Sequence, residues 1–572
     1  MIKALAAAAL LGGAVLVSAA GAVAPSPHAT VVVTGHPMTE AAGGPVDVSV
    51  TVPDLDVPAG RSIFRIGLQV PGMAHAQAVT EVRITDDEGA VPLIAAKGSE
   101  VTEDWGSGNG GDWRSSRRVH GTVTARYRLP LENIEILSGA PPIMMRIDGD
   151  GFSGQGSGLI ALPPTLQRAY RIRLHWDLKA MGAGAEGVSS YGDGDLDLPP
   201  GPLSRLDDAV FMAGRLKRYS PKPGAAFSAV WLGEPTFDPI AAMAWTAKMH
   251  AWMSRHFKDT SEPPYRVFLR YNPMNAGGGA ALTHSFIFTY KPGVTGESIK
   301  AILGHEMTHT WTAEQSLGKW YDEGDAVYYQ ALLPWRAGLI STDAYLKDVN
   351  ETASRYYTNP EKGAPDAEIT PRFWAETFIR VLPYDRGSLY FAVLNGKIRR
   401  ASGGKRSIDD LVQTLIDRRK AGLHNTEATW LELLKKEIGE DAITVHRSML
   451  AGGLMLPESG DYGPCFHRVV KQIRRFDLGF DNSSVLGPVK IIKGLKPGSE
   501  AEKAGIREGD RFTYGASLDA TQGDVTRTLT LNVVRDGKTV PISYLPRGEA
   551  VDAYQWERTP GVPEAACKGG VK

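Results

Sequence analysis

Alternating apolar and polar positions dominate the first third of the chain and predict a β-rich region. Val46–Val52 alternates with a period of two, as a half-buried strand does, and Pro53 is expected to end this strand. Further strands are predicted at Phe64–Val70 and Tyr170–Leu178, and glycine-rich turns at Gly106–Gly111 and Gly149–Gly158. We therefore predict an N-terminal β-rich domain over residues 27–204.

A helical period replaces this alternation in the middle of the chain. Ile299, Ile302, Leu303 and Met307 fall on one face of a helix predicted over Ser298–Thr312. Further helices are predicted at Ala241–Phe257, Asp325–Leu333, Arg386–Arg399 and Ser407–Ile416, and short strands at Arg266–Arg270 and Ser285–Tyr290. Residues 205–462 are thus predicted to form a helix-dominated domain with a small sheet.

Short strand patterns return near the C-terminus, at Val489–Ile492, Thr528–Arg535 and Thr539–Tyr544. They predict a small third domain over residues 470–550, followed by a tail at 551–572. A length of 572 residues suits several domains of about 150 residues each. The expected fold class is multidomain α+β.

The charge composition narrows the classes of partner. The chain carries 63 Lys and Arg against 64 Asp and Glu, which gives a formal net charge of −1. A balanced chain of this kind is not a disordered polyelectrolyte and has no general electrostatic attraction for nucleic acid. We expect neither a nucleic acid nor another polyelectrolyte as partner.

The first residues have the pattern of a secretion signal. A short basic start precedes the apolar stretch Ala4–Val17, which is too short to span a bilayer. Cleavage after Ala22 fits the small-residue rule and predicts a signal peptide over residues 1–22, whereas cleavage after Ala24 would leave a proline first. An uncleaved anchor helix is the alternative. No later stretch approaches a membrane span, so we expect a secreted or periplasmic protein.

The segment Gly304–His309 contains the pattern His-Glu-x-x-His on a predicted helix. A spacing of four puts His305 and His309 one turn apart on one face, where both imidazoles can bind one Zn²⁺. Glu306 is offset around the helix and can take a proton from the attacking water and pass it to the leaving amine. The plainer explanation is a polar helix face, but this helix falls in an apolar stretch after a strand. We predict one zinc ion per chain, with Glu306 as general base.

A catalytic zinc needs a third protein ligand and one open position. Glu323 opens the next helical pattern, and a second helix packed antiparallel can return its carboxylate to the metal. Glu314 lies five residues past His309, about 7.5 Å further along the axis of a continued helix. Glu323 is therefore the predicted ligand, with Asp322 and Asp325 as rivals.

The pattern His-Glu-x-x-His followed by Glu323-Gly324 at the start of a second helix resembles a gluzincin metallopeptidase. Most of the chain is similar to the glycyl-aminopeptidase family, whose members carry a β domain, a thermolysin-like catalytic domain and a C-terminal PDZ domain. Weaker traces of this family lie at Ser189–Gly192 and Val210–Gly214. The resemblance implies a zinc metallopeptidase that acts on peptides or proteins.

The resemblance implies functional roles for two further segments. Tyr384–Gly387 is similar to the Tyr-x-Lys-Gly motif of related aminopeptidases, whose Tyr donates a hydrogen bond to the tetrahedral oxyanion, a role that suits a neutral phenol. Asn275–His284 resembles the glycine-rich segment before an edge strand that lines the substrate cleft. It implies substrate contacts for Gly278, Gly279, Thr283 and His284. Taken alone, Tyr384 could be a core aromatic, and His284 could be a metal ligand, a substrate contact or a strand residue.

The chain departs from the family in two places. The connection between His309 and Glu323 is shorter than usual, which leaves the third ligand open. Thr283 stands where the family has a Glu, and related aminopeptidases use a Glu in this segment to bind the free α-ammonium of the substrate. A hydroxyl cannot neutralise a buried ammonium. We therefore expect weak exopeptidase activity, with N-terminally blocked peptides cleaved at least as well as free ones, unless Glu297 supplies the missing charge.

The C-terminal module carries another resemblance. Lys496–Asp510 is similar to the helix and turn of bacterial PDZ domains, and Leu478, Gly479 and Phe480 look like their carboxylate-binding loop. Free N–H groups in such a turn, beside an open strand edge, can hold the C-terminus of a peptide. The module could bind a peptide ligand, or it could be a spacer that docks on the catalytic domain.

Cys465 and Cys567 are the two cysteines of the chain. In an oxidising compartment we expect them to form a disulfide that ties the tail to the end of the catalytic domain. Two separate free thiols are the alternative.

Together these features predict a secreted or periplasmic zinc metallopeptidase that hydrolyses peptide bonds. The alternative is a PDZ-containing peptide-binding or scaffold protein with a catalytically weak metal site. The intact His-Glu-x-x-His pattern favours the enzyme, whereas Thr283 and the short connection favour the alternative.

Overall fold

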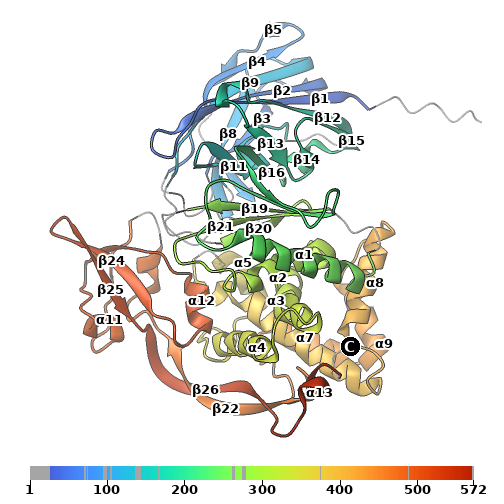
Figure 1. Cartoon of the computed structure of the whole chain (residues 1–572), viewed down its shortest axis with the longest axis vertical. Helices are drawn as coiled ribbons and strands as arrows, with labels where there is room; N and C mark the ends of the chain where they lie inside the picture. Colours follow the sequence, from blue (N-terminus) through green and yellow to red (C-terminus); the bar gives the residue numbers. More distant parts are fainter. Residues whose placement is uncertain are drawn as a thin grey trace, which may run out of the picture.

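The computed structural model describes residues 26–69, 73, 75–94, 99–103, 106–134, 144–164, 168–259, 264–272, 278–373, 375–486 and 489–569. The predicted signal peptide at 1–22 lies outside these residues, as does the start of the glycine-rich segment, Asn275–Gly277. Among the described residues, no helix has both the length and the apolar character needed to cross a membrane. The predicted order of a β-rich region followed by a helical region is confirmed (Figure 1).

The N-terminal β region, at the top of Figure 1, is built from sheets that share one apolar core. One sheet has the strand order β15-β12-β1-β2-β9-β4-β5, and in the other β8 pairs with β3, β6 and β7. Val48, Phe64, Tyr127 and Leu174 are among the buried residues of this core. The strands are β1 (His28–Gly35), β2 (Gly44–Val57), β3 (Ser62–Gly67), β4 (Thr80–Asp86), β5 (Gly89–Ala90), β6 (Leu93–Ile94), β7 (Ser99–Glu103), β8 (Gly106–Ser115), β9 (Val119–Leu131), β12 (Tyr170–Asp177) and β15 (Leu196–Gly201).

Three details of this region differ from the sequence prediction. The predicted turn Gly149–Gly158 contains a strand over Gly151–Gln155. Pro53 does not end β2, because the strand continues past a register shift between Val52 and Leu55. A bulge of this kind accommodates a proline, which cannot donate to the ladder. The predicted turn Gly106–Gly111 is instead part of β8. A Cβ at position 111 would stand 2.9 Å from a methyl group of Ile66, so the glycine permits close strand pairing.

A third sheet, in the order β10-β11-β16-β13-β14, joins the β region to the helical domain. Its residues Val188 and Met212 pack with Phe268 and Ile287 of the next sheet. Because β16 pairs with both β11 and β13, the β region extends past the predicted boundary at residue 204. The strands are β10 (Arg146–Asp148), β11 (Gly151–Gln155), β13 (Glu186–Ser189), β14 (Gly192–Asp193) and β16 (Val210–Gly214).

The helical domain contains a small sheet in the order β17-β18-β19-β21-β20. Strands β18, β19 and β21 run parallel, and β20 returns antiparallel as the edge strand. The predicted edge strand Ser285–Tyr290 is β21 and lies inside the sheet, because the glycine-rich segment before it forms a strand of its own. The strands are β17 (Lys217–Tyr219), β18 (Phe227–Trp231), β19 (Tyr265–Tyr271), β20 (Gly278–Leu282) and β21 (Ser285–Tyr290).

The predicted helices are confirmed with shifted ends, and the long helices α4, α9 and α10 have no counterpart among the predictions. Asp238 caps α1 by accepting the amide of Ala241 at 3.0 Å. The helices are α1 (Pro239–His256), α2 (Lys300–Thr312), α3 (Lys319–Arg336), α4 (Thr342–Tyr357), α5 (Ile369–Arg372), α6 (Thr377–Arg380), α7 (Leu382–Ala401), α8 (Ile408–Lys420), α9 (Glu427–Ile438) and α10 (Asp441–Leu450).

An antiparallel ribbon of β22 (Phe466–Phe476) and β26 (Arg547–Arg558) leads away from the helices to a C-terminal module, at the lower left of Figure 1. The module has its own apolar core, which includes Phe480, Phe512 and Leu531. The predicted strand Val489–Ile492 is wrong: this segment makes one isolated bridge to Arg511, and Val489 stays 53% exposed. The module contains α11 (Glu500–Lys503), β23 (Arg511–Tyr514), α12 (Leu518–Gly523), β24 (Leu529–Arg535) and β25 (Lys538–Tyr544).

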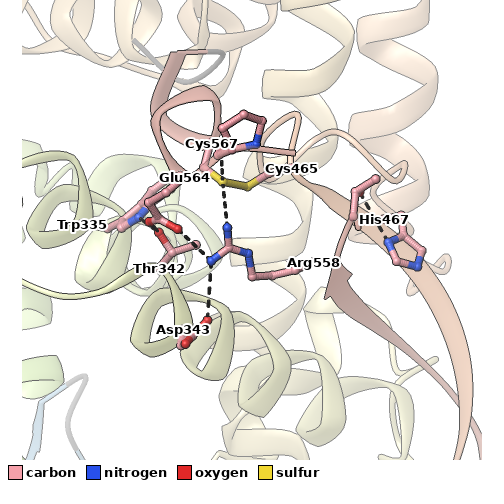
Figure 2. Close-up of a disulfide and its surroundings, with 10 residues drawn as sticks. Trp335, Thr342, Asp343, Cys465, His467, Arg558, Glu564 and Cys567 are labelled. Atoms are coloured by element: carbon pink, nitrogen blue, oxygen red, sulfur yellow. Dashed lines mark hydrogen bonds and ion pairs between the residues drawn. A yellow bond between two sulfur atoms is a disulfide. The ribbon is translucent and has the colours of Figure 1, made fainter. Parts of the chain in front are cut away.

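The C-terminal tail packs on the helical domain. Trp556 of β26 and Cys567 of α13 (Glu564–Gly569) belong to the same core as the helices. The predicted disulfide is present and joins Cys567 to Cys465, which directly precedes β22. Figure 2 shows Arg558 beside this bridge, where it pairs with Glu564 at 2.7 Å. The ribbon that carries the module is thus closed at its base by a covalent link.

Candidate metal centre

Two imidazoles and one carboxylate converge between α2 and α3. Nε2 of His305 lies 3.2 Å from Oε2 of Glu323, and Nε2 of His309 lies 3.8 Å from the same oxygen. One ligand atom from each residue lies within 4.8 Å of the others. Nitrogen and oxygen ligands of a tetrahedral zinc stand about 3.3 Å apart, given bonds of roughly 2.0–2.1 Å. The donor set and its spacing therefore fit one zinc ion.

Glycine contacts bring the helices of this centre close together. A Cβ on Gly304 of α2 would stand 2.4 Å from the carbonyl oxygen of Gln330 in α3. A Cβ on Gly324, the residue after Glu323, would stand 2.6 Å from the Cα of Gly387 in α7. Backbone atoms cannot move aside as a flexible side chain can. The three helices cross at positions where any side chain would push them apart.

The other acidic residues considered as third ligand have different surroundings. Oδ1 of Asp322 accepts the amide of Glu314 at 2.5 Å, and the Glu314 carboxylate accepts a hydrogen bond from Arg419 at 2.9 Å. Asp325 is fully buried, and burial raises the pKa of its carboxyl well above the usual range. Among the described residues, Glu323 supplies the carboxylate that faces both imidazoles.

The surroundings of the two histidines affect the orientation and the protonation of their rings. The side chain of Gln330 lies near His305, and Nε2 of Gln330 donates to Oδ1 of Asp348 in α4 at 2.8 Å. Outer partners of this kind fix the orientation of a metal-binding imidazole. Burial lowers the pKa of His309 to about 4, which leaves its ring neutral and able to act as a ligand.

Glu306 faces the edge of the sheet. Its Oε2 accepts the backbone amide of Ala281 in β20 at 2.8 Å. Burial raises the pKa of the Glu306 carboxyl to about 7. Within the described part of the chain, β20 pairs on one side only, with β21. The carboxylate thus lies between the histidine pair and the unpaired edge of a strand.

Tyr384 lies in the first turn of α7, with its ring beside that of His305. The two ring centroids are 6.0 Å apart and the planes differ by 21°. Burial, together with the charges of Glu323 and Glu306, raises the pKa of the phenol well above its usual value. The hydroxyl is therefore a neutral hydrogen-bond donor near the two carboxylates.

The four predicted substrate contacts separate into two pairs. Gly278 and Gly279 are residues of the edge strand β20. Thr283 and His284 form the turn between β20 and β21, where the amide of Thr283 donates to the carbonyl of Asp208 at 2.8 Å. His284 is exposed and has a left-handed backbone, with φ of 45°. It is a turn residue rather than a strand residue or a member of the metal group.

The structure does not place Glu297 as the missing ammonium anchor. This residue is exposed and pairs with Lys300 at 2.5 Å at the start of α2. Asp208 is an acidic residue that the sequence pattern does not single out, and its backbone is hydrogen-bonded to Thr283. Asp208 lies shortly before β16, so its nearness to Thr283 results from packing between segments distant in the chain.

The predicted carboxylate-binding loop is part of the core of the C-terminal module. Leu478 and Phe480 are 1% and 2% exposed. The amide of Gly479 donates to Oδ1 of Asp477 at 2.9 Å. The segment that follows forms a 3₁₀ turn at Asn482–Val485, whereas capture of a peptide as an added strand needs a strand edge beside the loop. Because the amide of Gly479 already donates to Asp477, it is not available to bind the C-terminal carboxylate of a peptide.

The features that the sequence pattern does not reveal are contacts rather than residue types. They are the amide of Ala281, the close approach of Gly324 to Gly387, and the support of His305 by Gln330. Glycines directly beside motif residues are the one signal in the sequence that points to such close packing.

Comparisons with known proteins bear on the fold. No protein-family model matches the chain, and no curated protein matches its sequence. The structure is similar to an aminopeptidase N family protein from Idiomarina loihiensis, with a TM-score of 0.66 and 15% identity over 95% of this chain and 100% of that chain.

Two more distant similarities are to an M1 zinc metallopeptidase from Deinococcus radiodurans and to yeast LTA4 hydrolase. The first has a TM-score of 0.45 and 17% identity over 76% of this chain and 94% of that chain. The second has a TM-score of 0.46 and 13% identity over 76% of this chain and 69% of that chain. The similarity to the Idiomarina protein shows that the chain shares its multidomain α+β fold.

Proposed function

We propose that the protein is a zinc-dependent metallopeptidase. The observation that carries this proposal is the convergence of His305, His309 and Glu323, with Glu306 and Tyr384 beside them. His305, His309 and Glu323 would hold the ion. Zinc bound there would supply a Lewis acid that polarises the scissile carbonyl and the attacking water.

Two side chains around this site have catalytic roles, one as general base and one as donor to the oxyanion. Glu306 is the general base, because its carboxylate can take a proton from the attacking water and deliver it to the leaving amine. The hydrogen bond from Ala281 holds this carboxylate toward the edge strand. Tyr384 donates a hydrogen bond to the oxyanion of the tetrahedral intermediate, which a neutral phenol can do without a proton change.

The proposed substrate is a peptide bound as an added strand along β20. The amide of Ala281 points away from β21, toward Glu306, and a strand repeats its hydrogen-bonding direction every second residue. The amide of Gly279 therefore faces the same open side. Main-chain bonds to this edge would hold an extended peptide next to the general base.

We propose a secreted or periplasmic location for the enzyme. The leader-like start of the chain supports it, as does the disulfide between Cys465 and Cys567. Disulfides persist in oxidising compartments and are rare in the cytosol.

A PDZ-containing binding or scaffold protein is the competing function. The likeness of Lys496–Asp510 to a PDZ helix and turn supports a PDZ assignment for the module. The bonded amide of Gly479 and the burial of Leu478 and Phe480 favour a docking role over capture of a peptide C-terminus. The PDZ assignment and a peptide ligand of the module stay predictions.

Metal analysis combined with cleavage of a peptide library tests the proposed function. The parent protein should bind one zinc per chain and cleave peptides, and His305→Ala should do neither. Glu323→Ala should lose zinc, whereas Asp322→Asn, at the neighbouring position, should keep it. A parent protein that binds zinc but cleaves no peptide would favour the scaffold function. Zinc bound to Glu323→Ala as tightly as to the parent would place the third ligand elsewhere.

A further inference from the structure

The C-terminal module contacts the helical domain through the carboxylate of Asp519, in α12. This carboxylate accepts hydrogen bonds from Nε and Nη2 of Arg380 at 3.0 and 2.8 Å. It also accepts one from the hydroxyl of Thr377 at 2.6 Å. Thr377 and Arg380 are the first and last residues of α6, and α6 leads directly into the turn of α7 that carries Tyr384.

The residue that follows Tyr384 is tied to the same point of the module. Asp385 is fully buried and accepts bonds from Nε and Nη2 of Arg355 at distances of 2.5–2.9 Å. Nη1 of Arg355 in turn donates to the backbone carbonyl of Asp519 at 3.3 Å. Tyr384 therefore lies between two anchors, Arg380 and Asp385, that both lead to Asp519.

The start of α7 has no side-chain cap of its own. Val381 occupies the N-cap position, and its side chain cannot accept a hydrogen bond from the first turn. A helix start without such a cap depends on outside contacts for its position. Asp519 supplies polar contacts of this kind from the module, and Phe378 of α6 packs against the module's apolar core.

The module also contacts the sheet of the helical domain. Nζ of Lys291, the residue after β21, donates to the carbonyl oxygen of Gly515, four residues before Asp519. The same short stretch of the module thus contacts both the end of the sheet and the helix start that carries Tyr384.

We propose that Asp519 is a positioning residue of the active centre, through which the C-terminal module fixes the place of the Tyr384 hydroxyl. The catalytic part of this inference rests on the proposed function, because it assumes that Tyr384 binds the oxyanion. The structural part, a clamp on α6 and the start of α7, does not depend on it.

The kinetic test compares Asp519→Asn with Asp510→Asn. Asp510 pairs with Arg535 at 2.6 Å inside the module, so its variant loses a similar ion pair away from α6. Asp519→Asn should lower kcat about tenfold, as expected for a lost charge-assisted hydrogen bond, with KM and zinc content near the parent values. Asp510→Asn should keep the parental kcat, and Asp519→Glu should recover part of the loss.

A double mutant shows whether Asp519 acts through Tyr384. In the Tyr384→Phe background, Asp519→Asn should cause little further loss of kcat, because the group it positions is already gone. An equal loss in both backgrounds would overturn the inference, as would a parental kcat for Asp519→Asn. Thr377→Val removes one of the same contacts and serves as a second variant if Asp519→Asn folds poorly.

Hydrogen exchange tests the clamp on α6 and the start of α7 without any measurement of activity. Asp519→Asn should speed amide exchange in residues 377–390, and Asp510→Asn should not. Unchanged exchange in this segment would overturn the inference even if the protein is a peptidase. If the parent cleaves no peptide but exchange responds as expected, the proposed function fails and the clamp stands.

Discussion

The edge of β20 and the loop Leu478–Phe480 are two places where a peptide could bind through main-chain hydrogen bonds. β20 pairs on one side only within the described chain, and its Ala281 amide points to Glu306. In the loop, the amide of Gly479 is bound to Asp477, and Asp477 also pairs with Lys496 at 2.8 Å. Sheet topology turns every second amide of β20, such as that of Gly279, toward the same open side as Ala281, whereas a loop has no such repeat.

The same contrast explains why the two regions differ in chemistry. The carboxylate that accepts the β20 amide is that of Glu306, the proposed general base. The main chain of a peptide is neutral, so this carboxylate does not repel it. At the loop the bound carboxylate is that of Asp477, so the amide of Gly479 and the ammonium of Lys496 both already have an anionic partner. We therefore expect peptides to bind at the metal centre and not at the loop.

The broadest effect, on activity, zinc binding and stability together, is expected from Gly324→Ala. The new Cβ would stand 2.6 Å from the Cα of Gly387, so α3 and α7 must separate and carry Glu323 away from Tyr384. A shift of about 1 Å costs roughly 100-fold in rate, and overpacking costs about 1–3 kcal/mol of folding stability. Cleavage rate, zinc affinity and Tm should all fall.

Gly363→Ala is the matched control for this change, because a Cβ there meets no atom within 4 Å. It should leave all three quantities near the parent values. Parental activity and Tm in Gly324→Ala would show that the helices do not need the glycine contact.

Tyr384→Phe should have a narrower effect, confined to kcat. Loss of one oxyanion donor lowers kcat by about 100- to 1,000-fold in other enzymes, and KM should change little because the contact forms in the transition state. Steady-state kinetics of the purified variant measure both. A parental kcat would remove Tyr384 from the mechanism.

A smaller effect is expected from blocking the substrate's N-terminus. Thr283 offers no negative charge to an α-ammonium, and main-chain bonds to β20 do not need a free terminus. An acetylated peptide should be cleaved at least as fast as the same peptide with a free terminus. If acetylation abolishes cleavage, an ammonium site exists, and Asp208, hydrogen-bonded through its backbone to Thr283, is the first residue to test, as Asp208→Asn.

No measurable binding is expected at the loop. Peptides with a free C-terminal carboxylate should bind the Glu306→Gln protein no more tightly than their amidated forms, because cleavage is blocked and only recognition of the carboxylate differs. Calorimetry or fluorescence anisotropy measures both. Micromolar binding that disappears on amidation would restore the loop as a peptide receptor.

The part of the site that sequence predicts is the part set by single elements. The pairing of His305 with His309 follows from the period of one helix, and the place of Glu323 follows from the start of the next. The edge position of β20 does not, because its glycine-rich sequence has weak strand propensity and is held by pairing with β21. The contacts of Gly324 with Gly387 and of Asp519 with Arg380 join residues far apart in the chain, which no local pattern encodes.

In the fold, too, the sequence predicts features of single elements but not those that depend on distant segments. Regular alternation predicted β2 and β12, and the helical period predicted α1, α2 and α7. Two of the wrong predictions are Pro53, where a bulge lets the strand continue, and Val489–Ile492, where Val489 stays exposed. In both cases the outcome depends on neighbouring segments rather than on the local sequence.

The most direct measurement of the central claim is zinc content and peptide cleavage in Glu306→Gln. The carboxylate of Glu306 is not part of the metal group, so the variant should bind one zinc per chain like the parent. It should lose most turnover, by about 100- to 10,000-fold, because an amide cannot accept the proton of the attacking water. Cleavage at the parental rate by a zinc-loaded variant would contradict the proposed mechanism.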